Sequence, residues 1–503
     1  MGGGARCWRL RGVLPLVALA AAGAALVVGC GGSSQRDASP LAPTTTAVGP
    51  AAPAAAAAGT LPATAAATLR AAAPAPTRPL PRVRLVVEVV DGDTGEPVLA
   101  AQVRIGGRPR IAGAGGRAYA RVLAARSLRV VVTARGFERR VMALPFDRAR
   151  KQRVLMYRQA AQWRMYGAGA GRTQAQRAIR LRPPFRVVWS RGLGSLLEFP
   201  AVVSEGVAYI AGFDGVVHAL SMADGAELWR HTPTDGKSAS SPAVWGDLLV
   251  VHDMRGHVTV LDRATGAVQR RVDVGSPVES SPLVLDGSDY FGTWDGRIVA
   301  LDLRSGRTRW SVSTGQKITA SAAVADGLLV IGDYGGTVHA LDPVTGAERW
   351  RAQVNGRVYG TAALADGRAF VPSSTGASLT ALSLADGSRL WRRTAGSYVY
   401  AAPAVWGGRV VFGSYDGLLR CVSAATGETL WTVSAGRPIS GAVVAVDGVA
   451  YAGTFAHRIL GIDVASGEQL LDFPHGEYVP VSGNGGRLLL HGYSRLYAVE
   501  PVR

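Results

Sequence analysis

A phrase of twelve residues recurs through the second half of the sequence and strongly limits the folds that the chain can adopt. One copy, HALDPVTGAERW, contains a Thr345-Gly346 turn and ends on Trp350. The turn glycines of the seven copies follow one another at spacings of 40 or 41 residues: Gly225, Gly266, Gly306, Gly346, Gly387, Gly427 and Gly467. Each unit holds about four short apolar runs separated by Gly, Asp or Ser turns. This period predicts a β-propeller, in which each four-stranded blade buries its faces against its neighbours.

The two ends of the repeat region predict how the ring closes. After the seventh phrase, the segment YVPVSGNGGRLLLHGYSRLYAVEP supplies three strands and no fourth. The earlier segment FRVVWSRG, whose Trp189 lies 40 residues before Trp229, has the form of an outermost strand. We therefore predict an all-β chain with an eight-bladed propeller at 162–503, closed by pairing of its first and last strands. Such closure removes the open sheet edge.

From Gln162 onward, the text QWRMYGAGAGRT and the following repeats resemble the PQQ-like (pyrroloquinoline quinone) repeat family, which includes the BamB-like lipoproteins of outer-membrane assembly. In that family a tryptophan of the outer strand stacks on the next blade near the turn glycine. The resemblance thus implies blade-docking roles for Trp189, Trp229, Trp310, Trp350, Trp391 and Trp431. Six buried tryptophans contribute roughly 12 to 18 kcal/mol, an amount comparable with the net stability of a domain. Packing alone therefore explains the repeated phrase.

The same resemblance raises the question of quinone chemistry. Catalytic quinoproteins of this fold resemble one another in a vicinal cysteine pair, a calcium site, a catalytic aspartate and long inserts. This sequence has no vicinal cysteines, its period leaves no room for inserts, and its Asp-Gly pairs are ordinary turn chemistry. His252 and His257 give only a weak metal-ligand spacing. We expect no catalytic residue, no metal and no cofactor, with a PQQ-dependent dehydrogenase as the alternative.

Strand directions predict that two sets of side chains share one face of the propeller, because the turn after the second strand emerges beside the loop leading into the first. The turns contribute Phe213, Met254, Trp294, Tyr334, Tyr415, Phe455 and Tyr493, and the loops contribute Glu198, Glu279, Tyr359, Tyr400, Glu477 and Tyr478. Aromatic groups with a few acids are typical of binding surfaces. The candidate partner-binding residues are Trp294, Tyr334, Tyr359, Tyr400, Tyr415, Glu279 and Glu477. Alternatively, these aromatic groups only pack on the neighbouring blade.

The N-terminus reads as an export signal, with arginines followed by an apolar run that ends in Val-Val-Gly-Cys. This ending resembles the lipobox of bacterial lipoproteins, which implies a signal peptide at 1–29 and lipidation of Cys30. An ordinary cleaved signal and an uncleaved anchor are the alternatives. Residues 30–81 are rich in Ala, Pro and Thr, too poor in large apolar groups to form a core, and are predicted to be a disordered linker.

Residues 82–157 alternate in strand fashion, and the phrase Asp91-x-x-Thr94-Gly95-x-Pro97 followed by AAQVRI resembles the carboxypeptidase regulatory-like family. The resemblance implies a small transthyretin-like β-sandwich without catalysis of its own. Residues 82–186 carry 23 basic and 6 acidic side chains, a net charge of +17, whereas 187–503 carry 26 basic and 29 acidic, a net charge of −3. Without a nucleic-acid recognition motif, the basic module suggests contact with anionic lipid or a wall polymer, and no nucleic-acid partner.

These features favour an exported protein, lipid-anchored to the membrane on its extracytoplasmic face. Its propeller is expected to act as a non-catalytic binding or scaffold platform for protein or cell-envelope glycan partners.

Overall fold

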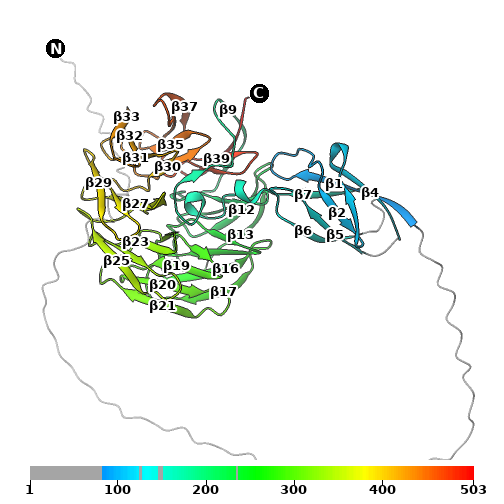
Figure 1. The fold of residues 1–503 in the computed structure, drawn as a ribbon, viewed down its shortest axis with the longest axis horizontal. Helices are drawn as coiled ribbons and strands as arrows, with labels where there is room; N and C mark the ends of the chain where they lie inside the picture. The colour runs from blue at the N-terminus through cyan, green and yellow to red at the C-terminus, as the bar shows by residue number, and fades with distance from the viewer. Residues whose placement is uncertain (1–81, 124–126, 146–150, 234–235, 503) are drawn as a thin grey trace, which may run out of the picture. The chain divides into compact units, whose positions relative to one another are not determined.

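The structure, a computed structural model, describes residues 82–123, 127–145, 151–233 and 236–502. The described residues all belong to one compact unit, 78–503. The predicted signal peptide and linker, with Cys30, lie outside the described residues. The regular secondary structure of the described part is almost entirely β-strand (Figure 1), with short 3₁₀ helices at η2 (Ala114–Gly116), η3 (Gln159–Ala161) and η4 (Tyr166–Ala168). The all-β prediction is confirmed.

Two sheets enclose one hydrophobic core between residues 82 and 157, with strand orders β4-β1-β7 and β3-β2-β5-β6. The strands are β1 (Arg82–Asp91), β2 (Gln102–Ile105), β3 (Arg108–Ile111), β4 (Arg117–Leu123), β5 (Ser127–Thr133), β6 (Arg140–Pro145) and β7 (Lys151–Met156). Strand alternation sends Val87 and Val89 of β1 into this core, together with Val130 and Val132 of β5. The residues between them, Glu88 and Val131, face away from this core and are partly exposed.

Eight sheets follow, each built around four antiparallel strands that are consecutive in space. The first four are β10 (Val202–Ser204), β11 (Val207–Ala211), β12 (Val217–Ser221), β13 (Glu227–His231); β14 (Ala243–Trp245), β15 (Leu248–His252), β16 (His257–Asp262), β17 (Val268–Asp273); β18 (Leu283–Leu285), β19 (Ser288–Gly292), β20 (Arg297–Asp302), β21 (Thr308–Ser313); β22 (Ala323–Ala325), β23 (Leu328–Gly332), β24 (Thr337–Leu341), β25 (Glu348–Gln353). The others are β26 (Ala363–Ala365), β27 (Arg368–Ser373), β28 (Ser378–Ser383), β29 (Arg389–Thr394); β30 (Ala404–Trp406), β31 (Arg409–Gly413), β32 (Leu418–Ser423), β33 (Thr429–Ser434); β34 (Val444–Val446), β35 (Val449–Thr454), β36 (Arg458–Asp463), β37 (Gln469–Pro474); β38 (Val481–Gly483), β39 (Leu488–His491), β40 (Arg495–Pro501), β9 (Phe185–Gly192). The seventh sheet gains a fifth strand, β8 (Ala175–Gln176).

The series of sheets closes on itself at its inner and its outer strands. The innermost strand β10 contacts both β14 and β38, so the first sheet neighbours the last. The last sheet is completed by β9, which pairs antiparallel with β40 and sets Trp189 opposite Ala498. FRVVWSRG thus occupies the outermost position that the sequence predicted for it. This closure leaves the last sheet with the same four-strand construction as its neighbours.

The segment 163–174 covers the free edges of the innermost strands. Trp163 bridges Val203 of β10. Its neighbours accept backbone hydrogen bonds of 2.7–2.9 Å from five further sheets, in the pairs Val244 to Arg164, Val324 to Ala170, Leu364 to Gly171, Val405 to Thr173 and Ala445 to Gln174. Because a buried N–H without a partner is costly, this segment supplies acceptors that the blades themselves lack. The lead-in is therefore part of the core of the ring.

Arg172 is fully buried within this segment. Its Nε donates to the carbonyl of Ala322 at 2.9 Å, and its Nη2 donates to that of Pro282 at 2.8 Å. These carbonyls come just before the innermost strands of two successive sheets. Its Nη1 donates to the carbonyl of Tyr166 at 2.5 Å. Burial lowers the pKa of the guanidinium to about 10, so the group stays charged at neutral pH and fastens the lead-in to both sheets.

Each repeated tryptophan packs on the turn glycine of the following sheet. In six pairs, ring atoms lie 2.5–3.0 Å from the position that a Cβ atom would take on the glycine: Trp189 with Gly225, Trp229 with Gly266, Trp310 with Gly346, Trp350 with Gly387, Trp391 with Gly427 and Trp431 with Gly467. Each indole N–H also donates to a backbone carbonyl near that turn, at 2.8–3.1 Å. Arg270 takes the same place against Gly306. The tryptophans therefore join neighbouring sheets.

Candidate functional site

The turn after the second strand of each sheet lies beside the loop that leads into its first strand. The backbone N–H of Tyr334 donates to the carbonyl of Lys317 at 2.9 Å, and that of Tyr415 donates to the carbonyl of Tyr398 at 3.0 Å. Equivalent bonds recur in other sheets, such as the one from Trp294 to Pro277 at 3.0 Å. The two predicted sets of side chains therefore share one face.

Seven rings on this face form a continuous band, which we name the aromatic rim. It consists of Tyr334, Tyr359, Tyr398, Tyr400, Tyr415, Phe455 and Tyr478. Neighbouring ring centroids lie 4.9–6.2 Å apart. Several pairs meet edge to face, the arrangement that aromatic quadrupoles favour. Tyr398 is the most open ring, with 44% of its surface exposed, whereas Tyr478 is buried.

Glu279 connects the third sheet to the loop that leads into the fifth sheet. Its carboxylate accepts a hydrogen bond from Nε1 of Trp294 at 3.0 Å and another from the hydroxyl of Tyr359 at 2.8 Å. Trp294 lies in the turn of the third sheet, and Tyr359 in the loop that leads into the fifth. Burial, followed by the nearby carboxylates of Glu279 and Glu198, raises the pKa of the Tyr359 hydroxyl far above its ordinary value. Tyr359 therefore stays a neutral donor, and the contact is a fixed part of the site.

Glu198 is the other acid at the centre of this face. Burial, followed by the charge of Glu279, raises the pKa of its carboxyl to about 7. Among the described residues, no donor hydrogen-bonds to this carboxylate and no basic group pairs with it. A carboxyl whose ionised form lacks a partner gains free energy when a cation or hydrogen-bond donor approaches. Glu198 is thus a carboxyl of this face whose ionised form lacks a described partner and would be stabilised by a cationic ligand.

Two lysine ammonium groups lie over aromatic rings on this face. Lys317 Nζ lies 3.4 Å from the centroid of Trp294 and 5.2 Å from that of Tyr334. Lys237 Nζ lies 4.9 Å from the centroid of Phe213. Burial lowers the pKa of Lys317. These contacts are cation–π interactions. The aromatic rings of this face therefore already bind ammonium groups of the same chain.

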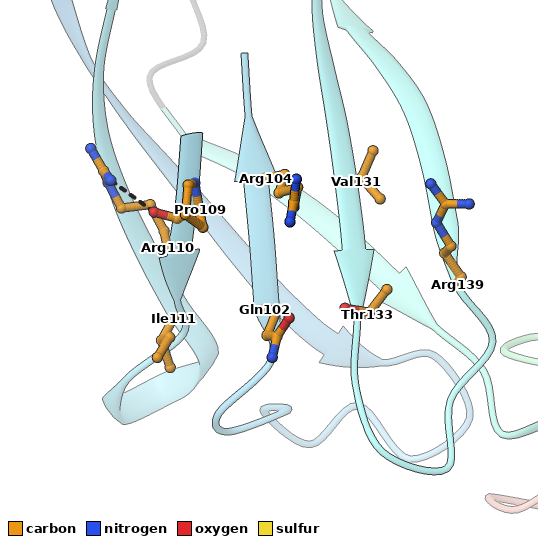
Figure 2. A pocket seen from close by; sticks show the side chains of 8 residues that line it. All are labelled: Gln102, Arg104, Pro109, Arg110, Ile111, Val131, Thr133 and Arg139. Carbon is orange, nitrogen blue, oxygen red and sulfur yellow. Dashed lines mark hydrogen bonds between the residues drawn. The ribbon is translucent and has the colours of Figure 1, made fainter. Parts of the chain in front are cut away.

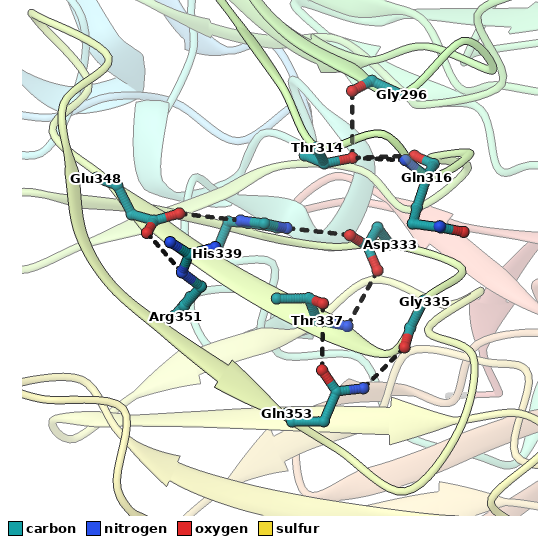
Figure 3. A network of polar contacts seen from close by, with 10 residues as sticks. All are labelled: Gly296, Thr314, Gln316, Asp333, Gly335, Thr337, His339, Glu348, Arg351 and Gln353. Carbon is teal, nitrogen blue, oxygen red and sulfur yellow. Dashed lines mark hydrogen bonds and ion pairs between the residues drawn. The ribbon is translucent and has the colours of Figure 1, made fainter.

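A polar network fixes the turn that presents Tyr334 (Figure 3). Asp333 Oδ2 lies 3.0 Å from Nε2 of His339, and Asp333 Oδ1 accepts from the backbone N–H of Thr337 at 3.0 Å. The other ring nitrogen of His339 lies 3.3 Å from Glu348. Burial opposes the charged imidazole, but the hydrogen bonds to both carboxylates outweigh it and raise the pKa of His339. The network makes His339 a support of the turn.

The structure brings six of the seven candidate residues into one connected set, while the side chain of Glu477 has a different partner. Trp294, Tyr334, Tyr359, Tyr400, Tyr415 and Glu279 lie in the connected set described above. Glu477 is buried at the end of the rim, beside Tyr478, and its Oε2 lies 3.1 Å from Nδ1 of His457. Burial raises the pKa of Glu477 despite this histidine. Sequence reasoning missed Tyr398, although it lies two positions before Tyr400 in the phrase SYVY of the same loop.

The histidines of the second sheet have separate partners. His252 is buried, with Nε2 at 2.7 Å from Asp289 and Nδ1 at 2.6 Å from the carbonyl of Ser280. His257 Nδ1 lies 3.0 Å from Asp253. Within the described ranges, no group of three or more His, Cys, Asp or Glu side chains could hold a metal ion. The weak metal spacing therefore corresponds to two different polar contacts.

No helix in the described residues is long and apolar enough to cross a membrane. Comparison with curated proteins finds the outer membrane protein assembly factor BamB of Shewanella oneidensis, 29% identical over 107 residues. This match covers 21% of the chain and 26% of the relative, so the chain spans about a quarter of that protein's length.

Solved structures share the fold. BamB from Moraxella catarrhalis superposes with a TM-score of 0.56 and 19% identity, covering 63% of this chain and 98% of that one. Quinohemoprotein alcohol dehydrogenase from Comamonas testosteroni superposes with a TM-score of 0.57 and 16% identity, covering 68% and 80%. At these identities the likeness shows a β-propeller fold and nothing more. The profile of the family described as outer membrane protein assembly factor BamB matches residues 213–316 and 294–499, more than half of the chain, and the chain therefore belongs to this family.

Proposed function

We propose that this chain is a non-catalytic scaffold that binds a protein partner at the aromatic rim. The observation that carries the proposal is the open part of this face, where exposed Tyr398 continues the band of rings and the carboxyl of Glu198 has no described partner. Aromatic side chains supply large contact areas at interfaces. Membership of the BamB family supports a role in outer-membrane assembly, the work that the name of the Shewanella relative describes.

The partner that suits this surface is a peptide segment with a basic side chain. Lys317 shows how an ammonium group stacks on Trp294, and Glu198 offers a carboxylate without such a partner. Binding of a lysine or arginine would favour the ionised form of Glu198. A cell-envelope glycan is the second candidate, because aromatic faces also stack on sugars. Binding of a basic peptide should depend on Glu198, whereas binding of a neutral glycan should depend on the aromatic rings alone.

The fold suits a platform of this kind. We infer that the eight sheets form one closed eight-bladed propeller, since β10 contacts β38 and β9 pairs with β40. The two-sheet module at 82–157 is inferred to be a carboxypeptidase regulatory-like sandwich. The chain is further proposed to be exported and anchored through lipid on Cys30. A ring closed by the pairing of β9 with β40 keeps the rim residues in fixed positions.

A PQQ-dependent dehydrogenase is the alternative from a different class. The quinone site of such enzymes contains a vicinal cysteine pair and a calcium ion, and the described residues do not fit this arrangement. The described cysteine, Cys421, is buried in β32, and the described residues contain no cluster that could bind a metal. Quinone and calcium added to the purified protein, with dye reduction as the readout, separate the two classes. Sustained turnover would refute the scaffold proposal.

Photo-crosslinking tests the proposed docking face. In one variant a photoreactive phenylalanine analogue replaces Tyr398 on the rim. In the control it replaces Val344, which is 78% exposed in the turn between β24 and β25, at the end of β24 opposite to the Tyr334 turn. In the native host we expect a discrete protein adduct from position 398 and none from position 344. Glu198→Gln combined with the probe at 398 should weaken this adduct. Adducts of equal yield from both positions would contradict a specific docking face.

A further inference from the structure

The solvent face of the sheet β3-β2-β5-β6 carries a second candidate site. In this sheet Val103 and Val130 point into the core, while Gln102, Arg104 and Thr133 point outward. Eight side chains line a cavity of about 540 Å³ on this face (Figure 2): Gln102, Arg104, Pro109, Arg110, Ile111, Val131, Thr133 and Arg139. The three charged groups among them are all arginines.

No described carboxylate lies within ion-pair distance of Arg104, Arg110 or Arg139. Arg110 is held at the sheet edge, where its Nε donates to the carbonyl of Tyr119 at 3.2 Å and its Nη1 to that of Pro109 at 2.8 Å. Both contacts are to neutral carbonyls, so the positive charge is not cancelled. Guanidinium groups bind phosphate and carboxylate oxygens through paired N–H donors. The cavity is therefore suited to an anionic group.

The distribution of charge favours this module, and not the propeller, as the part of the chain that binds an anion. The segment 161–186 contributes six basic residues to the net charge of +17, but most of them have structural roles. Arg172 is buried, Arg182 pairs with Asp463 at 2.5 Å, and Arg186 pairs with Glu500 at 2.9 Å. The unneutralised positive charge lies mainly on the sandwich. On its opposite sheet, Glu88 pairs with both Arg117 and Lys151.

Large apolar side chains stand beside the arginines. Ile111 is 72% exposed at the edge of the cavity, and Val141 of β6, opposite Val131 in the sheet register, is 49% exposed. Cationic groups beside exposed apolar groups fit the surface of an anionic bilayer, where phosphates lie above hydrocarbon. A soluble polyanion would leave the apolar groups in water. We propose that this face, centred on Arg104 and Arg139, binds the phosphates of anionic lipid headgroups at a membrane surface.

Vesicle sedimentation with the full chain tests this site. All variants carry Cys30→Ser, so that lipidation cannot contribute, and binding is compared on phosphatidylcholine vesicles with and without phosphatidylglycerol. Arg104→Gln/Arg139→Gln is expected to lower the partition coefficient on phosphatidylglycerol vesicles roughly tenfold to thirtyfold. The matched control, Arg84→Gln/Arg121→Gln, removes the same charge from the opposite sheet and should lower it less than threefold, on the order of the general electrostatic effect.

Two results would overturn the proposal. The first is an equal loss of vesicle binding in the two double variants, which would indicate general electrostatics in place of a site. The second concerns a soluble polyanion: Ile111→Ser should weaken vesicle binding but leave binding of inorganic polyphosphate unchanged. If Ile111→Ser changes neither, while Arg104→Gln/Arg139→Gln abolishes polyphosphate binding, the site is one for a soluble polymer and the membrane assignment is wrong.

Discussion

The ring of Trp310 lies 2.7 Å from the position that a Cβ atom would occupy on Gly346, and no larger residue fits there without movement. Gly346 also has a positive φ of 74°, a conformation that is costly for residues with a side chain. One glycine thus serves two purposes, a tight turn and a seat for the tryptophan of the preceding sheet. This double requirement explains why the sequence repeats its turn glycine and its tryptophan together.

Gly346→Ala is expected to destabilise the fold by about 2 to 4 kcal/mol, through backbone strain and overpacking against Trp310. Gly327→Ala is the matched control, because Gly327 has a φ of 75° with no atom within 4 Å of its would-be Cβ. It should cost only about 1 kcal/mol. Urea unfolding of both variants measures the difference. Equal costs would show that the tryptophan moves aside freely and that docking adds little.

Arg172→Met should destabilise the ring by at least about 3 kcal/mol, because several buried carbonyls, including those of Ala322 and Pro282, lose their donor. Arg177→Met is the control, since Arg177 is exposed and only stacks over Trp406 at 5.7 Å. The midpoint of urea unfolding reports both effects. A stable Arg172→Met protein would show that the lead-in is held by its backbone bonds alone.

The carboxyl of Glu198 should make the stability of the fold depend on pH. Its folded pKa of about 7 lies above the ordinary value of 4.5, so the folded state holds the proton more tightly between these values. Its contribution to stability is therefore fully present below pH 4.5 and is lost as the pH rises to about 7. Glu198→Gln should match wild type near pH 4 and exceed it by about 1 to 3 kcal/mol at pH 8.

Urea unfolding across this range tests that expectation, with Asp214→Asn, an exposed turn carboxylate, as the control. The control should show the same difference from wild type at both ends of the range. A Glu198→Gln protein that is no more stable than wild type at pH 8 would mean that the carboxyl is well solvated.

The residues of the aromatic face should divide into structural and open groups. Tyr359→Ala is expected to cost about 2 kcal/mol or more, because it removes a half-buried ring and the donor to Glu279. Tyr398→Ala should stay within about 0.5 kcal/mol of wild type, since 44% of its surface is exposed. Thermal and urea unfolding measure both. A large loss at Tyr398 would identify it as a packing residue and weaken its candidacy for docking.

The anchoring prediction concerns Cys30, whose sulfur would carry the lipid. Cys30→Ser is expected to move the protein from the membrane fraction to the soluble fraction, and mass spectrometry of the wild type should show a lipid adduct on the N-terminal peptide. A wild type without the adduct, together with a mutant that still sediments with membranes, would rule out lipidation.

The repeat made much of the ring predictable, because each blade obeys the same local rules. The packing of Trp310 and the other docking tryptophans follows from the repeat period, which brings a tryptophan and a turn glycine together six times. The contact of Tyr359 with Glu279 was not predictable, since it joins side chains 80 residues apart whose meeting depends on the radius of the ring. Arg172 was missed for a similar reason, because nothing in QWRMYGAGAGRT indicates which residue is buried.

The pairing of β9 with β40 means that the last sheet cannot be completed until β40 has been synthesised. Arg186 and Glu500, which meet across that pair, are 314 residues apart in the sequence. Contacts at such separations form late, because closing a long loop costs entropy before the contact is made. Until β40 is available, a chain emerging during synthesis holds β9 without its partner, and this state is open to intermolecular strand pairing. Loss of β40 would therefore leave β9 unpaired and the series of sheets open, and so would impair the maturation of the whole fold.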